Sequence, residues 1–416
     1  MQANQHILLI GTVWPEPNSS AAGSRTMQLI EQFQKRKWKI TFACAAADSQ
    51  FSIDFDKYNI DKVTIELNNS SFDAFIKNLQ PTIVLFDRFM MEEQFGWRVA
   101  ENCPDALRIL DTIDLHCLRL ARQQAFKEKR EFIIDDILDT DMAKREIASI
   151  YRCDCTIMIS EYEMQLLQQL FKIDKAILHY TPFLLEQIKQ EQINVWPAFE
   201  ERNHFVTIGN FLHEPNWNGV LFLKEEIWPL IRKQLPDAQL HIYGAYASPK
   251  VTQLHNPKEG FLVKGRAKSA SEVMLNGRIC LAPLRFGAGL KGKLIDAMEC
   301  GTPSVTTPVG AEAMHGSLDW AGSVAYTAKE FADEAVELYN NKAKWLAAQQ
   351  NGIEIINTVF DKEFHTQFLM DRITELQNNL QQHRRKNFMG SVLMHHTVSG
   401  TKYMSRWIEE KNKKRD

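Results

Sequence analysis

The chain has 416 residues, of which 44% are hydrophobic and 24% are charged, and its formal net charge is -3 at pH 7. It is too long for one ordinary core, so we expect two or three domains, with two as the working number. No stretch approaches the roughly 18 continuous apolar residues of a membrane span, and the small negative charge gives no general attraction to nucleic acid. Because the first residues enter a strand without a signal-peptide pattern, we expect a soluble, cytoplasmic protein.

Short apolar runs, rich in β-branched residues, alternate with longer helical patterns along the chain. This alternation predicts βαβ units and parallel sheets rather than a sandwich. The predicted strands of the first half cover residues 6–13, 39–46, 62–67, 82–87, 107–114 and 155–160. Those of the second half cover residues 204–211, 239–245, 261–266, 278–284, 303–309 and 322–327. Helical periodicity predicts helices at 27–37, 161–171 and 360–382, and one long charged helix around Leu118–Ser149.

The two sets of strands predict an α/β protein with two doubly wound, Rossmann-like domains. We expect an N-terminal domain over residues 1–185, a polar, Pro-flanked linker over 186–203 and a C-terminal domain over 204–360. The helix at 361–382 is expected to cross back to the N-terminal domain. Paired domains of this kind bind ligands outside the carboxyl ends of their strands, so functional residues should directly follow strands.

The last segment, residues 383–416, is basic, with nine Lys or Arg against three acids. A charge run of this kind is most often a solvated, partly disordered end, and that is our expectation here. The alternative is peripheral contact with anionic lipid, which would make the protein membrane-associated. The seven cysteines are scattered, without CxxC or zinc spacing, so we expect reduced, mostly buried thiols.

The most informative stretch is Leu284–Gly310, reading LRFGAGLKGKLIDAMECGTPSVTTPVG. A predicted strand ends at its first residue, and the helix KLIDAMEC follows a Gly-rich turn. Glycines let the backbone approach an anion, and the helix start supplies free N–H groups and the positive end of its dipole. The stretch therefore predicts a diphosphate-binding loop, made of Arg285, Gly287, Ala288, Gly289, Leu290, Lys291 and Lys293.

The charged residues of this stretch favour a phosphate-binding site over a plain turn. Arg285 offers a planar fork of donors, and Lys291 and Lys293 add point charges. Asp296 lies one turn into the helix, about 5 Å along its axis, near the distance between a nucleotide's phosphates and its ribose. A plain Gly-rich turn, which is the alternative, has no need of three cations and a downstream acid.

The same stretch resembles the donor-binding region of GT-B glycosyltransferases of family 4, the group 1 glycosyltransferases. In that family a Gly-rich turn, a basic residue and an acidic residue, in a helix ending in A-M-x-x-G-x-P, grip a nucleotide-sugar. Four other segments follow the family's order: IGNFLHEPNWNGVLFL, LPDAQLHIYGA, FLVKGR and MISEYEMQLL. The resemblance covers about residues 6–365 and is most specific from Ile279 to Met314. It implies the GT-B fold, a central cleft, and sugar transfer from a nucleotide-diphosphate donor with retention of configuration.

Two positions depart from the family's pattern. The family pairs two glutamates eight positions apart, and here Asp296 matches the second while the first falls on Ala288. The opening of the second domain usually carries an Arg and a Lys, where this chain has Asn210 and HEPN. We interpret Arg285, Lys291 and Lys293 as the replacement cations, as in the subgroup with an R-x-G-x-G-x-K-x-K loop. The missing glutamate leaves the contacts to the sugar hydroxyls undefined.

In the first domain, two segments are candidates for the site. Gly23 and Ser24 lie on a small-residue loop that resembles the family's N-terminal glycine loop, and the alternative is a loose turn with Ser24 as a helix cap. Asp114 and His116 follow the strand LRILDTID, and the resemblance to the family's D-x-H region makes them our catalytic candidates. Either side chain can accept or share the acceptor's proton, although with retention the leaving phosphate can take that proton itself.

Further donor contacts are expected at strand ends of the second domain. Gly209 and Asn210 should line the cleft, and the predicted base contacts are Tyr243, Gly244, Gly265 and Arg266. The two D-x-D matches, at residues 54–56 and 139–141, are interpreted as solvated acids, so no metal and no cofactor is predicted.

The leading hypothesis is a hexosyltransferase that uses a nucleotide-sugar donor and a glycan, lipid-linked or protein acceptor, without nucleic acid. Two alternatives remain open: a sugar-nucleotide epimerase of the same fold, and a catalytically idle GT-B domain that acts as an assembly partner.

Overall fold

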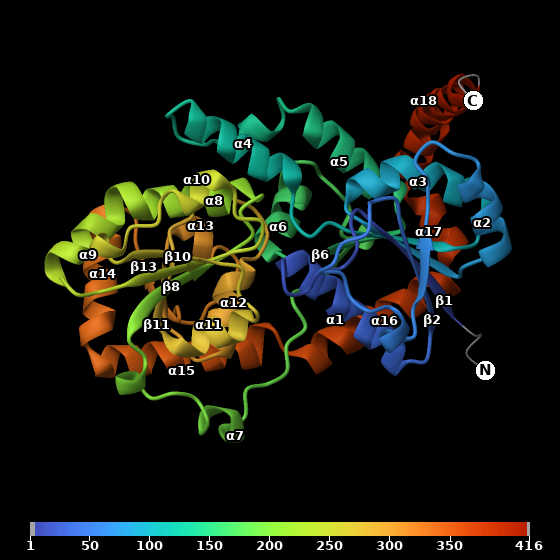
Figure 1. Cartoon of the computed structure of the whole chain (residues 1–416). Helices are drawn as coiled ribbons and strands as arrows, with labels where there is room; N and C mark the ends of the chain where they lie inside the picture. Colours follow the sequence, from blue (N-terminus) through green and yellow to red (C-terminus); the bar gives the residue numbers. More distant parts are fainter. Residues whose placement is uncertain (1–4, 414–416) are drawn as a thin grey trace.

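The computed structural model of the chain has two α/β domains, each built on one parallel sheet (Figure 1). It describes residues 5–413, without the side chains of residues 396–399. Residues 1–4 of the predicted N-terminal domain and residues 414–416 of the predicted tail lie outside the described residues. The predicted fold class, two doubly wound α/β domains, is confirmed.

The N-terminal domain contains a seven-stranded sheet in the order β3-β2-β1-β4-β5-β6-β7. All neighbouring strands are parallel. The strand order reverses between β1 and β4, which is where a crevice opens in such sheets. The strands are β1 (His6–Gly11), β2 (Lys39–Cys44), β3 (Asp61–Thr64), β4 (Ile83–Asp87), β5 (Leu107–Asp111), β6 (Cys155–Met158) and β7 (Leu178–Tyr180). Of these, β7 was not predicted, because three residues are too short a run to show a period.

The C-terminal domain contains a six-stranded sheet in the order β10-β9-β8-β11-β12-β13. It is also parallel throughout, with its reversal between β8 and β11. All six predicted strands of this half are present: β8 (His204–Ile208), β9 (Leu240–Tyr243), β10 (Phe261–Gly265), β11 (Gly277–Ala282), β12 (Ser304–Thr306) and β13 (Gly322–Val324).

Helices cover both faces of each sheet. Those of the N-terminal domain are α1 (Ala21–Lys35), α2 (Ser71–Leu79), α3 (Phe89–Asn102), α4 (His116–Lys127), α5 (Asp141–Arg152) and α6 (Glu161–Gln169). The linker carries the short α7 (Gln190–Ile193). Those of the C-terminal domain are α8 (Glu214–Phe222), α9 (Trp228–Gln234), α10 (Pro249–Thr252), α11 (Ala270–Asn276), α12 (Gly292–Glu299), α13 (Pro308–Ala311), α14 (Ala328–Asn340) and α15 (Lys342–Val359).

The single long helix predicted around Leu118–Ser149 is wrong. The segment forms two helices, α4 and α5, joined by a connection with its own short 3-10 turn. Lys129 has a left-handed backbone, with φ of 55°, which ends regular helix. Thr140 then caps α5 by accepting a hydrogen bond from the backbone N–H of Ala143 at 3.0 Å. The charged pattern continued across the break, so periodicity alone did not reveal it.

After α15 the chain returns to the N-terminal domain as α16 (Lys362–Asn378). Leu369, Met370 and Ile373 are buried in the same core as β1, β2, β4 and β5. At the start of α16 the Lys362 ammonium lies 2.8 Å from the carboxylates of Glu31 and Glu186. In Figure 1, α15 lies below the C-terminal domain and α16 below the N-terminal domain, so these two consecutive helices link the domains.

The expectation of a partly disordered basic end is also wrong for the described residues. The segment continues as α17 (Leu380–Lys386) and α18 (Phe388–Lys413), and α18 packs on α5 and α3. Arg384 binds Asp154 at 2.7 Å, and Lys402 binds Glu101 at 2.8 Å. Acids of the N-terminal domain thus neutralise part of this charge, which a reading of local composition does not show.

We predict that Leu369→Ala destabilises the protein by about 2–5 kcal/mol, because Leu369 is fully buried where α16 joins the N-terminal core. Chemical denaturation followed by circular dichroism measures this change. Leu346→Ala, at a helix position that is 45% exposed, is the matched control and should cost less than about 1 kcal/mol. Equal effects of the two substitutions would contradict the packing role of α16.

Candidate active site

A cavity of about 730 Å³ lies between the two domains, at the carboxyl ends of both sheets. Segments that follow β1, β4 and β5 contribute to its lining from the N-terminal domain, and those that follow β8, β9, β10 and β11 contribute from the C-terminal domain. The predicted residues that line it are Ser24, Asp114, His116, Gly209, Asn210, Gly244, Arg266, Gly287, Ala288, Leu290, Lys291, Lys293 and Asp296. Gly23, Tyr243, Gly265, Arg285 and Gly289 are not among the lining residues.

The Gly-rich loop is pressed against the N-terminal domain. Gly289 has a left-handed φ of 62°, and a Cβ atom there would lie 2.8 Å from the Cβ of Asp114. A Cβ atom at Gly292 would lie 2.5 Å from the Cβ of Ala21. These glycines therefore allow a close approach between the domains, as well as the approach to a ligand that the sequence suggested.

Two helices begin at this junction. Lys291 is the N-cap of α12 and gives the first turn no side-chain hydrogen bond, which leaves N–H groups and the positive end of the helix dipole for an anion. On the other side α1 begins at Ala21, and its cap is Ser20, which accepts from Gly23 N at 3.1 Å. Ser24 is not the cap; its hydroxyl donates to the carbonyl of Pro17 at 2.9 Å.

Lys291 and Lys293 are two of the cations that line the cavity, with Arg25, Arg88, Arg119 and Arg266. Burial lowers the pKa of Lys293 to about 8, against the opposing effect of Asp296 and Cys280. Burial also lowers the pKa of Lys291, whose Nζ donates to the carbonyl of Gly289 at 2.6 Å. Both groups have lost water that an anionic ligand would replace, so they can bind a phosphate strongly.

Arg285 lies outside the cavity. Its guanidinium lies over the rings of Phe126, at 4.6 Å, and Phe222, at 4.5 Å, and its Nε donates to Asn218 Oδ1 at 2.7 Å. The sequence showed a cation after a strand, but not the side to which its side chain turns. In this structure Arg285 joins α8 to the loop instead of facing the ligand space.

Two acids follow on the same face of α12. Burial raises the pKa of Asp296 to about 7, and Lys293 opposes this shift. Glu299 lies one turn later on the same helix, and its side chain is exposed. Glu299 also lines the cavity and was missed in the sequence, although its i+3 spacing from Asp296 is the signal that pointed to it.

At the position of the family's first glutamate, Ala288 packs against the core of the N-terminal domain. A carboxylate still reaches this place, from Glu163 on α6. Its Oε1 accepts from Gly289 N at 2.7 Å and from Leu115 N at 3.2 Å, while its Oε2 is buried without a partner. Burial raises the pKa of Glu163. The sequence could not indicate this contact, because it joins positions that are 126 residues apart.

Asp114 and His116 lie together at the cavity wall. The Nε of Arg119 lies 2.7 Å from one oxygen of Asp114, and the Nε2 of His116 lies 3.3 Å from the other. Burial acts to raise the pKa of Asp114, but Arg119 and His116 outweigh it and hold the pKa at about 2. Burial lowers the pKa of His116 to about 4. Asp114 is therefore ionised and His116 neutral at pH 7.

A second histidine joins this cluster from the other domain. His213, at the start of α8, lines the cavity, and burial lowers its pKa to about 4, with Arg119 acting in the same direction. The sequence analysis noted the HEPN segment only as a departure. Its histidine is a functional candidate, because the domain arrangement places it near Asp114.

A buried ion pair holds the domains on each side of this site. Arg122 of α4 binds Glu312 through two bonds of 2.9 and 2.7 Å and donates to the carbonyl of Gly287 at 2.9 Å. Bidentate pairs of this kind are geometrically specific. On the far side of the cavity, Arg266 donates to Ser19 Oγ at 2.6 Å and lies 3.6 Å above the ring of Phe51.

The remaining predicted contacts are mainly structural. Gly244 donates its N–H to the carbonyl of Gly265 at 2.8 Å, and Tyr243 ends β9 just outside the cavity. Asn210 is held by its neighbours, since its Oδ1 accepts from Leu212 N at 2.9 Å. Among the side chains that the structure describes, no group of three or more His, Cys, Asp or Glu residues is placed to hold a metal ion.

The C-terminal domain is similar in sequence to a known protein family. Residues 202–341, the greater part of the C-terminal domain, match the family model described as "Glycosyl transferases group 1". No curated protein matches the sequence. The resemblance inferred from the donor loop is therefore confirmed at the level of this domain.

Several solved structures, one of them described as a glycosyltransferase, are similar to most of the chain. Sucrose-phosphate synthase from Thermosynechococcus elongatus superposes with a TM-score of 0.66 at 16% identity, covering 89% of this chain and 99% of that one. Anabaena Alr3699/HepE, in complex with UDP and glucose, gives 0.65 at 12% identity, covering 88% and 99%. WaaG, involved in lipopolysaccharide biosynthesis, gives 0.57 at 12% identity, covering 85% and 95%. At these identities the likeness shows the fold alone, which is GT-B.

We predict that Gly289→Ala opens the cleft, because the added Cβ would meet Asp114 of the opposite domain. Gly265→Ala is the matched control, since Gly265 also has a positive φ, of 79°, but nothing lies within 4 Å of its added Cβ. Both substitutions carry a backbone penalty of about 1–2 kcal/mol. Small-angle X-ray scattering should show a larger radius of gyration for Gly289→Ala only. An unchanged radius for both variants would contradict the view that Gly289 allows the close approach of the two domains.

Proposed function

We propose that the protein is a glycosyltransferase that moves a sugar from a nucleotide-diphosphate donor to an acceptor hydroxyl, with retention of the anomeric configuration. The observation that carries this proposal is the meeting of two helix starts, α1 and α12, around Lys291 and Lys293 at one cavity between the domains. The group 1 match of residues 202–341 supports the same activity.

The donor diphosphate would bind at the start of α12. There Lys293 and the free N–H groups of the first turn can neutralise the charge that develops on the leaving group. Asp296, one turn further along, would accept hydrogen bonds from the ribose hydroxyls. Arg266 and Gly244 border the space beyond it, where a base can lie.

The acceptor would approach from the N-terminal domain, beside Asp114, His116 and His213. With its pKa held at about 2, Asp114 is a weak base at neutral pH. This favours a route in which the departing phosphate takes the acceptor's proton, while the neutral imidazoles orient the hydroxyl by hydrogen bonding. The cluster would then position the acceptor rather than deprotonate it.

We infer that the reaction needs only the donor and the acceptor, without a resident cofactor or metal. UDP is the first nucleoside diphosphate to test, since the Anabaena HepE structure is a complex with UDP and glucose. The transferred group would be a hexose and the acceptor a glycan, a lipid-linked sugar or a protein, in the cytoplasm.

A panel of nucleoside diphosphates, followed by thermal shift, tests donor binding, and a radiolabelled nucleotide-sugar then tests turnover. Label that moves to an acceptor or to water supports a transferase. A sugar nucleotide that returns with one inverted centre identifies the epimerase alternative. Binding by calorimetry without turnover on any acceptor favours an idle domain, and the absence of binding by every diphosphate overturns the phosphate site.

We predict that Lys293→Ala weakens binding of the nucleoside diphosphate that the panel identifies by about 10- to 100-fold, the loss expected for one charge-assisted hydrogen bond. Isothermal titration calorimetry measures the change. Arg285→Ala should stay within about threefold of the unchanged protein, because its guanidinium faces Phe126 and Phe222. Lys258→Ala, at an exposed site on the same domain, controls for net charge. A greater loss for Arg285→Ala than for Lys293→Ala would contradict the assigned cations.

A further inference from the structure

Arg88 has a backbone conformation that favours glycine. It directly follows β4, with φ of 71° and ψ of 158°, a region that is almost confined to glycine. A glycine would adopt this conformation without strain, yet the chain has a long cationic side chain here, and that residue lines the cavity between the domains. Strained residues of this kind gather at ligand sites, where the side chain is needed in one place.

The neighbouring strand is followed by a second strained residue. Ile113, after β5, has φ of 63°, which is exceptional for a β-branched residue. Asp87 of β4 and Asp111 of β5 are partners in the sheet, so the segments that follow these two strands lie side by side. Ile113 also lines the cavity. The strain is therefore concentrated at one edge of the N-terminal sheet, on the side from which the acceptor would approach.

Arg119 of α4 is a second cation at this edge. Its Nε lies 2.7 Å from Asp114, and the Nε of Arg88 lies 3.5 Å from Asp87. Each carboxylate contacts its guanidinium at Nε, and within the described part of the chain the terminal Nη groups of both arginines have no hydrogen-bond partner. The ends of these planar forks match the oxygens of a phosphate or a carboxylate.

Arg25, which also lines the cavity, has no such free end. Its two Nη groups donate to backbone carbonyls, that of Thr181 at 2.8 Å and that of Pro182. Its side chain is fully buried. Arg25 therefore holds the segment after β7 in place, whereas Arg88 and Arg119 have donors left for a ligand.

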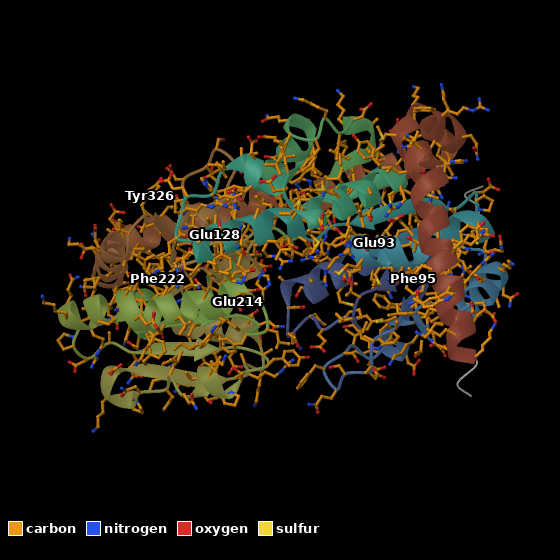
Figure 2. The ribbon with its side chains drawn as sticks, turned by 90° about the horizontal axis from the view of Figure 1, so that it is seen from above. Glu93, Phe95, Glu128, Glu214, Phe222 and Tyr326 are labelled. Atoms are coloured by element: carbon orange, nitrogen blue, oxygen red, sulfur yellow. The ribbon has the colours of Figure 1, made fainter. Side chains whose placement is uncertain are left out.

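The two arginines lie near the histidines of the cavity. Burial is the main cause of the lowered pKa of His116, and Arg119 and Arg88 act in the same direction. Burial and then Arg119 lower the pKa of His213. Figure 2 shows α4 reaching from the N-terminal domain toward α8, with Glu128 labelled just after the end of α4 and Glu214 at the start of α8. Arg119 therefore lies on a helix that spans the cleft.

We propose that the acceptor carries an anionic group, a phosphate or a carboxylate, and that Arg88 and Arg119 bind this group. The inference rests on the proposed transferase function and specifies the class of its acceptor. The donor diphosphate has cations of its own, Lys291 and Lys293, on the other domain. An anion held by the two arginines would place a neighbouring hydroxyl of the acceptor in the cleft, where the neutral imidazoles of the cavity can orient it.

Ligand-observed NMR titration of the full chain tests this site with glucose 6-phosphate, glucuronate and the neutral sugar glucose as probes. The titrations are run at constant ionic strength, with and without the nucleoside diphosphate that the panel identifies. We expect at least one anionic probe to bind about 10-fold or more tightly than glucose in both conditions, because a charge-assisted hydrogen bond contributes about this much.

Substitutions of Arg88 separate binding from folding. Arg88→Gly should weaken the binding of the anionic probe about 10-fold and leave that of glucose unchanged, and the protein should stay folded because glycine adopts this backbone without strain. Arg88→Lys keeps the charge without the fork and should retain part of the preference for the anion. Arg119 is left intact, since its loss would leave Asp114 without its closest cation.

Lys172→Gly is the matched control. Lys172 also has a positive φ, of 54°, and its side chain is exposed outside the cavity. This variant removes the same charge from a similar backbone and should bind all three probes as the unchanged protein does. Thermal unfolding checks that each variant is folded.

Equal affinity for the three probes, or a preference that Arg88→Gly leaves intact, would overturn the proposal. Two other results would assign the arginines to the donor instead: a preference that disappears when the nucleoside diphosphate is bound, or diphosphate binding that falls as far in Arg88→Gly as in Lys293→Ala. If no nucleotide binds but the preference persists and depends on Arg88, the anion site stands and the proposed transferase function fails.

Discussion

The site depends on one close contact, between the Gly-rich loop of the C-terminal domain and the N-terminal domain. The N–H of Gly289 donates to Glu163 at 2.7 Å, and neither Gly289 nor Gly292 has room for a Cβ atom. Only because the backbones come this near do the starts of α1 and α12 face the same cavity. Each domain alone would hold half of the site, and the Arg122–Glu312 pair fixes the distance between the halves.

The charged side chains along α12 suit a ligand that has both negative charge and hydroxyl groups. Lys291 and Lys293 lie at the start of α12, and Asp296 and Glu299 lie further along the same helix. Burial disfavours the charged form of three of them: it lowers the pKa of both lysines and raises that of Asp296. Desolvated charges of this kind gain most from a partner that supplies the opposite charge or hydrogen bonds. A diphosphate at one end and hydroxyl groups at the other are such partners.

The last three helices pack on the N-terminal domain, although they follow the C-terminal domain in sequence. Residues of α16 complete the core below β1 and β2, while α18 covers α5 and α3. Asp154, Glu101 and Arg98 of the N-terminal domain bind polar side chains of α17 and α18. The apolar side of α18 remains outward, which is the reverse of an ordinary surface helix.

The sequence by itself determined the two parallel sheets, most of the helix predicted at 360–382, which ends at Asn378, and the loop from Leu284 to Gly310, because local periodicity and glycine spacing specify them directly. It also identified Lys291, Lys293 and Asp296 as residues of the cavity, since each follows a strand end or lies one helical turn from it. Only the tertiary structure decided that Arg285 turns away, that Glu163 binds the Gly-rich loop and that His213 lines the cavity. Side-chain direction and contacts between distant segments depend on packing across the whole chain, and neighbouring residues in sequence carry no signal of them.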